Sequence, residues 1–409
     1  MSAPSAPPAR GARLRAPSRL VGVDAARGVA LLGMVATHVL PLETYDADGF
    51  ETGASLTAVL AAGRASALFA VLAGVSLALA GGGTRPPVGR GLARARRGVA
   101  ARAGVVAAVG LLVGSFGAPV AVILVNYGLL FLVALPFLGW GPRRLVPLGA
   151  AWLVVVPVLL HPLRGALQGA GLLSLRPGSS PTPLSLADPV ELVGHLLLTG
   201  YYPVLSWAGF LVLGLGVGRL DLRRAGTVVV VALGGLAAAL VAWASSAALL
   251  PLAAPSLEVP AGFPTPAETL GTALQTGFYG TTPTTSWWWL VVDAPHSGTP
   301  PDMVGVAGSA LAVLGAVLLL ARVARPVVWP FAAMGSMTLT LYSLHVLSLG
   351  VLVGYEVATA SPGPDPSVLY TVQVVGLLLV GGLWQLTGRR GPLEGLAAAA
   401  SRAARGPDR

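Results

Sequence analysis

Residues 227–253 read TVVVVALGGLAAALVAWASSAALLPLA and contain no charged side chain. A helix needs about 20 apolar residues to cross a hydrocarbon core of roughly 30 Å, so this stretch is long enough to span a membrane. Comparable stretches recur along the whole chain, which is 55% hydrophobic and only 10% charged. Soluble domains carry about 25% charged residues. The sequence therefore predicts an integral membrane protein.

Working outward from this stretch, we expect an all-α, polytopic membrane bundle of about ten transmembrane helices. The bundle occupies residues 20–387, preceded by a disordered basic tail at 1–19 and followed by a cytoplasmic tail at 388–409. The predicted spans are 20–40, 56–80, 99–117, 119–138, 145–162, 199–218, 227–253, 303–324, 329–352 and 368–387. The first span is too long for the apolar part of a signal peptide, so we expect it to remain as a helix.

The positions of the arginines predict the orientation. Arginines cluster at 85–102, 143–144, 219–224, 322–325 and 389–409, between alternate spans. Cytoplasmic loops carry an excess of basic residues, so this pattern places the N terminus on the cytoplasmic side. Most of the acidic residues then fall in the outer segments. The bias toward Ala, Gly, Pro and Arg is typical of a GC-rich bacterial genome, so we expect a multi-pass protein of a bacterial plasma membrane.

Composition also excludes several classes of function. The net charge of +10 comes from short clusters between apolar spans, not from one soluble face, so no nucleic-acid partner is expected. The chain has no Cys, which excludes disulfides and a Cys-ligated metal. GxSxG, HExxH and Walker-type motifs are absent from the sequence. We therefore expect no metal cofactor.

Ionisable groups in the first span are candidates for function, because a charge inside a bilayer is unfavourable by a few kcal/mol or more. Asp24 and Arg27 lie one turn apart near the inner end and can form an ion pair. That pair is either structural or a cytoplasmic anchor at which Arg27 meets a phosphate. His38 lies about 21 Å further along the helix, near the outer end. Its side chain suits a general base at neutral pH.

A second histidine is predicted at the same depth. His345 in the span 329–352 lies about 24 Å from the inner end of that helix. Tyr342 belongs to the same polar stripe, which either joins helices or lines a site. Two histidines at matched depth on separate helices are more specific than either one alone, so we take His38 and His345 as catalytic candidates.

Tyr342 and several other polar residues are candidates for substrate binding. Arg64 lies well inside the span 56–80 and needs a partner, for which Asn126 and Tyr127 are available. His296 stands among Pro, Ser and Gly residues that predict an ordered or re-entrant turn against the bundle. Trp287–Trp289 form either an interfacial anchor or an aromatic platform for a sugar or lipid.

Two segments resemble a known membrane family. They are RLVGVDAARGVALLGMVATH at 19–38 and LFAVLAGVSLALAGG at 68–82, with the pattern D-x-x-R-G followed by F-x-x-L-x-G-x-S. PHSGTPPDMVGVAGSALAVLG, GSMTLTLYSLH and RRGPLEGL match further along the chain. The sequence thus resembles the heparan-alpha-glucosaminide N-acetyltransferase-like proteins, including their YeiB-like bacterial branch. The resemblance covers the N-terminal 80 residues and most of 290–395.

The resemblance implies acyl transfer across the membrane. The lysosomal relative takes acetyl-CoA from the cytosolic side and acetylates an amino sugar on the far side. Here it implies acetyl-CoA or another acyl-CoA as donor, held by Arg27 and Asp24, and a glycan or cell-envelope acceptor. His38 falls where the lysosomal enzyme has a polar Asn. The catalytic His of that enzyme lies in the first outer loop, and residues 41–55 here contain no His. Either His38 or His345 takes this role, or the chemistry differs.

Two alternatives remain at this point. A transporter or flippase of a small molecule or lipid-linked sugar would also bury charges such as Arg64 in Gly-rich spans. However, we find no clear internal repeat between the two halves of the chain. A non-catalytic membrane protein is the second alternative. The sequence reveals neither the acceptor nor the acyl group.

Overall fold

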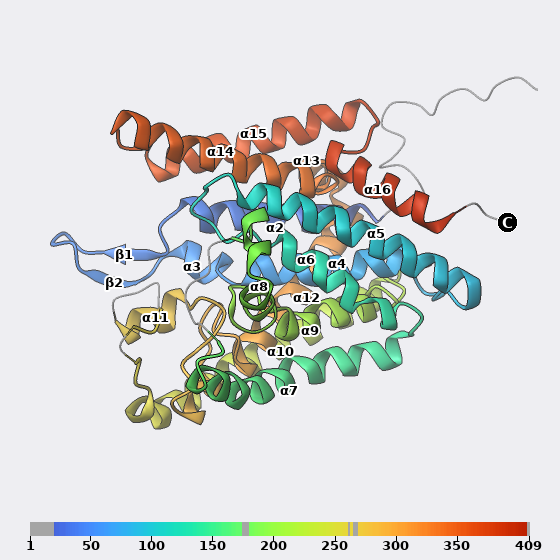
Figure 1. Ribbon diagram of the computed structural model, residues 1–409. Coiled ribbons are helices and arrows are strands. Elements are labelled where there is room, and N and C mark those ends of the chain that lie inside the picture. Colours follow the sequence, from blue (N-terminus) through green and yellow to red (C-terminus); the bar gives the residue numbers. More distant parts are fainter. Residues whose placement is uncertain (1–19, 174–179, 261, 265–268, 407–409) are drawn as a thin grey trace, which may run out of the picture.

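The computed structural model describes residues 20–173, 180–260, 262–264 and 269–406, so the predicted tail at 1–19 lies outside the described residues. The chain forms a bundle whose long helices run roughly parallel to one another (Figure 1). It opens with α2 (Val21–Val39), the hairpin β1 (Glu43–Tyr45) and β2 (Glu51–Ala54), α3 (Leu56–Ala61) and α4 (Arg64–Ala80). The antiparallel hairpin pairs Glu43 with Ala54.

The middle of the chain adds helices of very different lengths. They are α5 (Gly89–Gly114), α6 (Leu124–Val133), η1 (Leu135–Phe137), α7 (Pro142–Gly169), η2 (Pro183–Ala187), α8 (Pro189–Gly194), the π-turn η3 (His195–Thr199), α9 (Val204–Val217), α10 (Ala225–Ala253) and η4 (Ala254–Ser256). The chain ends with α11 (Leu270–Thr276), η5 (Trp287–Val291), α12 (Pro300–Val323), α13 (Arg325–Gly335), α14 (Thr338–Thr359), α15 (Pro366–Leu386) and α16 (Pro392–Arg405).

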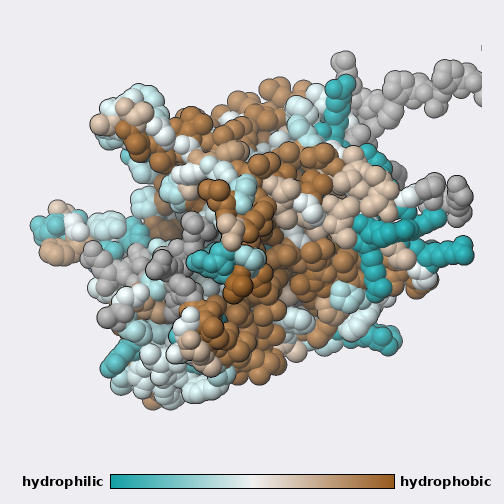
Figure 2. Space-filling view, in the orientation of Figure 1, coloured by the Kyte–Doolittle hydropathy of each residue, from teal (hydrophilic) through white to brown (hydrophobic). Residues whose placement is uncertain are grey.

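Seven of the described helices are long and apolar enough to cross a membrane, and the number is eight if the bent pair Pro189–Thr199 and Val204–Val217 forms one span. Figure 2 shows apolar side chains in the middle of the visible face and hydrophilic ones at its two ends, as expected for a membrane protein. The predicted span 119–138 contains only the ten-residue α6, which is followed by Pro136 in η1. The predicted span 329–352 is broken, because α13 ends at Gly335 and α14 starts at Thr338.

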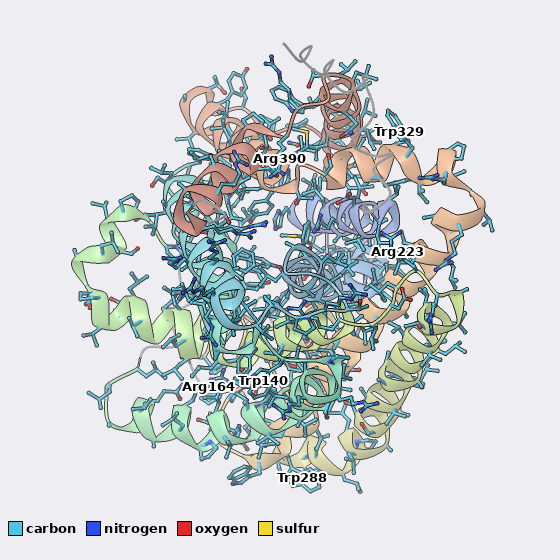
Figure 3. All side chains as sticks on the ribbon, turned by 90° about the vertical axis from the view of Figure 1, so that its right-hand side faces the viewer. Trp140, Arg164, Arg223, Trp288, Trp329 and Arg390 are labelled. Carbon is cyan, nitrogen blue, oxygen red and sulfur yellow. The ribbon has the colours of Figure 1, made fainter. Side chains whose placement is uncertain are left out.

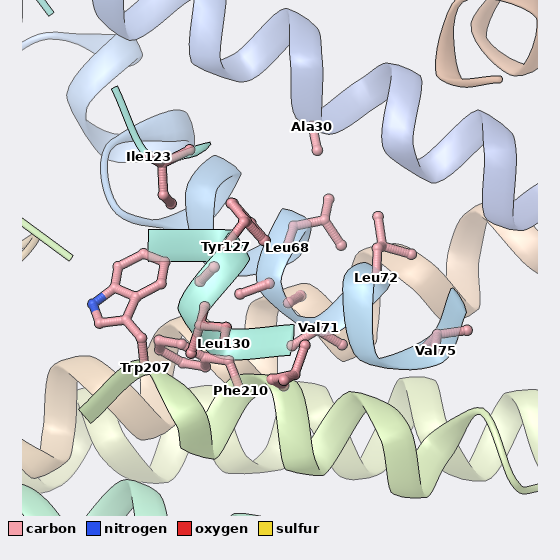
Figure 4. Packing of buried hydrophobic residues seen from close by; sticks show 14 of the residues in the cluster. Ala30, Leu68, Val71, Leu72, Val75, Ile123, Tyr127, Leu130, Trp207 and Phe210 are labelled. Atoms are coloured by element: carbon pink, nitrogen blue, oxygen red, sulfur yellow. The ribbon is translucent and has the colours of Figure 1, made fainter. Parts of the chain in front are cut away.

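The core lies around α2, α4, α6 and α9. Figure 4 shows Leu68 and Val71 of α4 packed near Tyr127 and Leu130 of α6, with Phe210 of α9 below them. In the end-on view of Figure 3, α2 and α4 lie near the middle, and α7, α10 and α15 lie toward the outside. The central helices are therefore shielded, whereas α10 and α15 leave most of their surface free to meet lipid.

Close helix contacts explain the glycine of the D-x-x-R-G segment. A Cβ at Gly28 of α2 would overlap the carbonyl oxygen of Phe331 on α13. A Cβ at Gly335 of α13 would in turn overlap the carbonyl oxygen of Asp24. Glycine at both positions lets the two backbones touch, as small residues do in membrane helix pairs. This contact holds α2 in place, and α2 carries Asp24, Arg27 and His38.

The two ends of the bundle have additional structure. At one end the hairpin packs against α11, and the side chain of Gln275 accepts a hydrogen bond of 3.0 Å from the Ala54 amide. Trp289 is buried there, whereas Trp287 and Trp288 remain exposed, and Trp288 lies at the periphery in Figure 3. At the other end, the segment predicted as a C-terminal tail forms α16, which packs against α5.

Candidate active site

A cavity of about 550 Å³ opens at the end of the bundle that carries the hairpin. Its wall includes His38 at the end of α2, Ser66 at the start of α4, Tyr201 and Tyr202 before α9, and His296 before α12. The volume lies within the roughly 300–1,000 Å³ that small-molecule sites occupy. Segments from across the sequence therefore converge on one site.

The two histidines predicted at matched depth are side by side. Nδ1 of His38 lies 3.0 Å from Nε2 of His345, and the two rings are nearly parallel, at 6°, with centroids 5.2 Å apart. His345 is fully buried, whereas His38 lines the cavity. The ring of Tyr342 lies 6.4 Å from that of His38. The pair is thus reached from the cavity through His38.

His296 forms another part of the wall. Its φ of 55° is in the left-handed region, which side chains other than glycine seldom adopt. Its ring packs against Tyr201, with centroids 4.5 Å apart, and stacks parallel to Trp207 at 6.3 Å. Burial lowers the pKa of His296 to about 3, so the ring is neutral at physiological pH. The predicted ordered turn against the bundle is present.

Three of the residues predicted to bind substrate, Arg64, Asn126 and Tyr342, do not line the cavity. Arg64 is not deep in a continuous helix, because the chain breaks at Gly63, which has a φ of 71°. The guanidinium of Arg64 donates to the carbonyl of Val59. Asn126 donates to the carbonyl of Tyr202 at 2.9 Å, so it supports the cavity wall from behind. The expectation that Asn126 and Tyr127 pair with Arg64 is wrong.

Asp24 and Arg27 lie at the other end of α2. Nη1 of Arg27 lies 2.7 Å from Oδ1 of Asp24, and Nη2 donates to the hydroxyl of Ser76 on α4. The predicted ion pair is therefore present, with Asp24 buried and Arg27 partly exposed. The pair joins α2 to α4, which gives it a structural role whatever else it does.

A small pocket at this same end collects arginines. Arg102, Arg219 and Arg405 line a space of about 30 Å³ together with Ser401. The Nε atoms of all three arginines are buried without a hydrogen-bond acceptor among the described residues. Buried unpaired donors are unfavourable, so these groups favour an anionic group in the pocket.

Sequence reasoning missed two residues behind the histidine pair. Oε1 of Gln373 on α15 lies 3.3 Å from Nδ1 of His345, and Nε2 of Gln373 donates to Oγ of Ser348 at 2.8 Å. Gln373 is an amide within the span 368–387, and Ser348 follows His345 by one turn. A polar side chain in an apolar span was the available signal for both.

Within the part of the chain that the structure describes, no group of three or more His, Asp or Glu residues is arranged to hold a metal ion. The fold and the cavity define a class: a helical membrane protein with a histidine pair at a cavity large enough for a small molecule. The family model of the catalytic domain of heparan-alpha-glucosaminide N-acetyltransferase matches residues 19–250, which is more than half of the chain. The chain belongs to this family. No curated protein matches it.

Family membership indicates a membrane acyltransferase, and the family in general uses acetyl-CoA as its donor. The matched region includes Asp24, Arg27 and His38, but it ends before His296 and His345. The residues that complete the cavity and the histidine pair therefore come from the part of the chain beyond the match.

Proposed function

We propose that this protein is an integral membrane acyltransferase. It moves an acetyl or other acyl group from a cytoplasmic acyl-CoA to a hydroxyl or amine of a glycan or other cell-envelope acceptor at the outer face. The observation that carries the proposal is the pair of His38 and His345, 3.0 Å apart, at a cavity of about 550 Å³. Neutral imidazole beside a substrate-sized space is the arrangement that a general base needs.

The chemical step uses the pair as a proton carrier. The acceptor hydroxyl or amine gives its proton to the imidazole while its oxygen or nitrogen bonds to the thioester carbonyl carbon. The carbon–sulfur bond then breaks, and the departing CoA thiolate takes the proton from the imidazole. Atoms and charge balance without a metal or an oxidant. Tyr201, Tyr202 and His296 supply aromatic and polar surface on which a sugar can rest.

The arginine pocket is the candidate contact for the phosphates of the donor. Its space of about 30 Å³ holds no more than a small group, so it would take one phosphate and not the whole of CoA. On α4 the cavity is lined by Ser66 and the pocket by Leu77, about 16 Å apart along the helix. Apolar core residues such as Leu68 and Leu72 lie between them. The acyl arm of the donor has to pass this core.

The orientation of the chain belongs to the same proposal. Adding α2 and the short α6 to the seven long helices and the bent pair gives the ten crossings expected from the sequence. With the N terminus in the cytoplasm, the arginine pocket faces the cell interior and the cavity faces outward. The protein would then be a multi-pass protein of a bacterial plasma membrane.

The test is acetyl-CoA consumption by the purified protein, with glucosamine as the acceptor probe and release of free CoA thiol as the readout. We expect His38→Ala and His345→Ala each to lose most of the activity. His161→Ala is the matched control, because His161 on α7 does not line the cavity. Full activity in both histidine-pair variants would contradict the proposal. Glucosamine uptake by vesicles without CoA release would instead indicate the transporter alternative.

A further inference from the structure

A chain of hydrogen bonds extends from the cavity into the bundle. It runs from His38 on α2 to His345 on α14, then to Gln373 on α15, and back to Ser348 on α14. The chain closes where Oγ of Ser348 meets the carbonyl oxygen of His345 at 2.6 Å. Three helices therefore meet through four side chains, and only His38 lines the cavity.

The direction of each bond follows from the Ser348 end. Two oxygens 2.6 Å apart must share a proton, and a carbonyl has none, so the Ser348 hydroxyl donates to the carbonyl of His345. With its proton used, Oγ of Ser348 can only accept from the amide NH₂ of Gln373. The carbonyl oxygen of Gln373 then faces His345. The Ser348 contact therefore fixes the orientation of the Gln373 amide.

The tautomers of both histidines follow in turn. The oxygen of Gln373 accepts, so Nδ1 of His345 carries the proton, and Nε2 of the neutral ring is left as an acceptor. Nδ1 of His38 must therefore donate to Nε2 of His345. The lone pair of His38 is then on Nε2, for which no hydrogen-bond partner is found among the described residues. A base needs this form of the ring.

We propose that Ser348, Gln373 and His345 are positioning residues that hold His38 in the tautomer whose Nε2 can accept a proton from the cavity. The inference rests on the proposed function and deepens it, because it makes His38 the single catalytic base and gives His345 a supporting role. When His38 takes up a proton, both of its nitrogens donate, and the lone pair of His345 still accepts from Nδ1. The hydrogen bonds that link His38 to His345, Gln373 and Ser348 therefore remain intact when His38 is protonated.

The groups around His38 set the pH dependence. They are His345 and Tyr342 on α14 and His296 before α12, and no carboxylate of the described residues is hydrogen-bonded to the pair. A carboxylate introduced behind His345 would favour the protonated imidazole. Gln373→Glu keeps an acceptor for Nδ1 of His345, so it should keep the tautomers while moving the acid limb of the pH profile to higher pH by about one unit.

Gln373→Leu removes that acceptor and frees the tautomers. His345 can then carry its proton on Nε2 and donate it to Nδ1 of His38. The proton of His38 then lies on its own Nε2, so Nε2 of His38 can no longer accept a proton from the cavity. We expect kcat to fall about 100-fold, which is the scale of general base catalysis. KM for acetyl-CoA should change little. Gln385→Leu is the matched control, because Gln385 lies on the same helix and accepts from Ser336 instead.

The deciding measurement is the ¹⁵N solid-state NMR spectrum of the imidazoles of the full chain in bilayers, with the His38 signals assigned by comparison with His38→Ala. We expect a protonated Nδ1 and a bare Nε2 on His38 in the native protein, in Gln373→Glu and in Gln385→Leu, and the reverse in Gln373→Leu. A bare Nδ1 on His38 in the native protein, or unchanged tautomers in Gln373→Leu, would overturn the proposal that Ser348, Gln373 and His345 set the tautomer of His38. The spectra need no turnover, so absence of acetyl transfer by the native protein would overturn the proposed function alone.

Discussion

The two ends of the bundle use polar side chains in opposite ways. The hairpin end has a roomy cavity lined by neutral rings and hydroxyls, with the histidine pair behind it. The other end has many arginines but only a small pocket, and Arg96, Arg219 and Arg322 donate to backbone carbonyls. The single guanidinium of Arg219 donates to four carbonyls, those of Ala78, Gly81, Gly83 and Leu138. The charged residues thus stabilise local structure at one end, whereas the proposed chemistry depends on uncharged groups at the other.

The largest effect should come from Arg219, which tests whether the arginine end is held together by such contacts. Arg219→Met removes four hydrogen bonds from a buried guanidinium to backbone carbonyls, each contributing about 1 kcal/mol, so the free energy of unfolding should fall by about 3 kcal/mol or more. Thermal unfolding of the detergent-purified protein measures this loss. Arg143→Met, at an exposed arginine on α7, should leave the midpoint unchanged. Equal midpoints for both variants would show that the contacts of Arg219 contribute little.

A substitution of Arg102 tests whether the arginine end of the bundle also binds the acyl-CoA donor. Arg102→Gln removes a guanidinium whose Nε has no acceptor among the described residues. We expect KM for acetyl-CoA to rise about tenfold, or about 1.4 kcal/mol, with kcat unchanged. Steady-state kinetics with Arg143→Gln as the control measure this change. A fall in kcat at constant KM would show that Arg102 does not contribute to donor binding.

Gly63 tests how the hairpin end forms its cavity wall. The residue has a φ of 71° at the break between α3 and α4, and the nearest atoms to an added Cβ are 3.6 Å away. Space is available, so Gly63→Ala should be unfavourable mainly through its backbone conformation, by about 1 kcal/mol. Gly234→Ala within α10, where nothing lies within 4 Å of an added Cβ, should not lower the unfolding temperature. Equal unfolding temperatures in the two variants would exclude this strain.

The smallest effect concerns the pH dependence that His296 gives to the cavity wall. Burial holds the pKa of His296 at about 3, below the 6.5 of an unfolded chain, so the unfolded state binds its proton first as the pH falls. Stability should therefore decrease from about pH 6.5 toward pH 3. His296→Gln should reduce the drop in unfolding temperature between pH 7 and pH 5 by about 2–4 °C. An unchanged drop would show that His296 is hydrated in the native state.

The sequence was sufficient to predict a helical membrane protein and to place His38 and His345 at the same level of the bundle. Counting 1.5 Å per residue from the inner ends placed His38 and His345 at one level, and the structure brings them into contact although α14 is broken from α13. Asp24 and Arg27 were predicted to pair because their spacing is local. Their catalytic and donor-binding roles are still proposals.

The predictions from the sequence fail where the position of a side chain depends on tertiary contacts. Arg64 was placed deep in a span because hydropathy does not register the helix break at Gly63. Asn126 faces Tyr202 and not Arg64, since the direction of a side chain depends on helix rotation, which a lone apolar segment does not define. Gln373 was overlooked because a single amide in an apolar span does not indicate which neighbouring helix it will meet.

The central claim is acyl transfer from the arginine end to the cavity end through His38. Sealed proteoliposomes with glucosamine trapped inside and [¹⁴C]acetyl-CoA added outside test it most directly, because protein inserted with the arginine pocket outward can transfer label only across the membrane. We predict N-acetylglucosamine label inside vesicles of the native protein and its near-complete loss with His38→Ala, while His161→Ala resembles the native protein. Equal label in the His38→Ala vesicles, or none with the native protein, would contradict the claim.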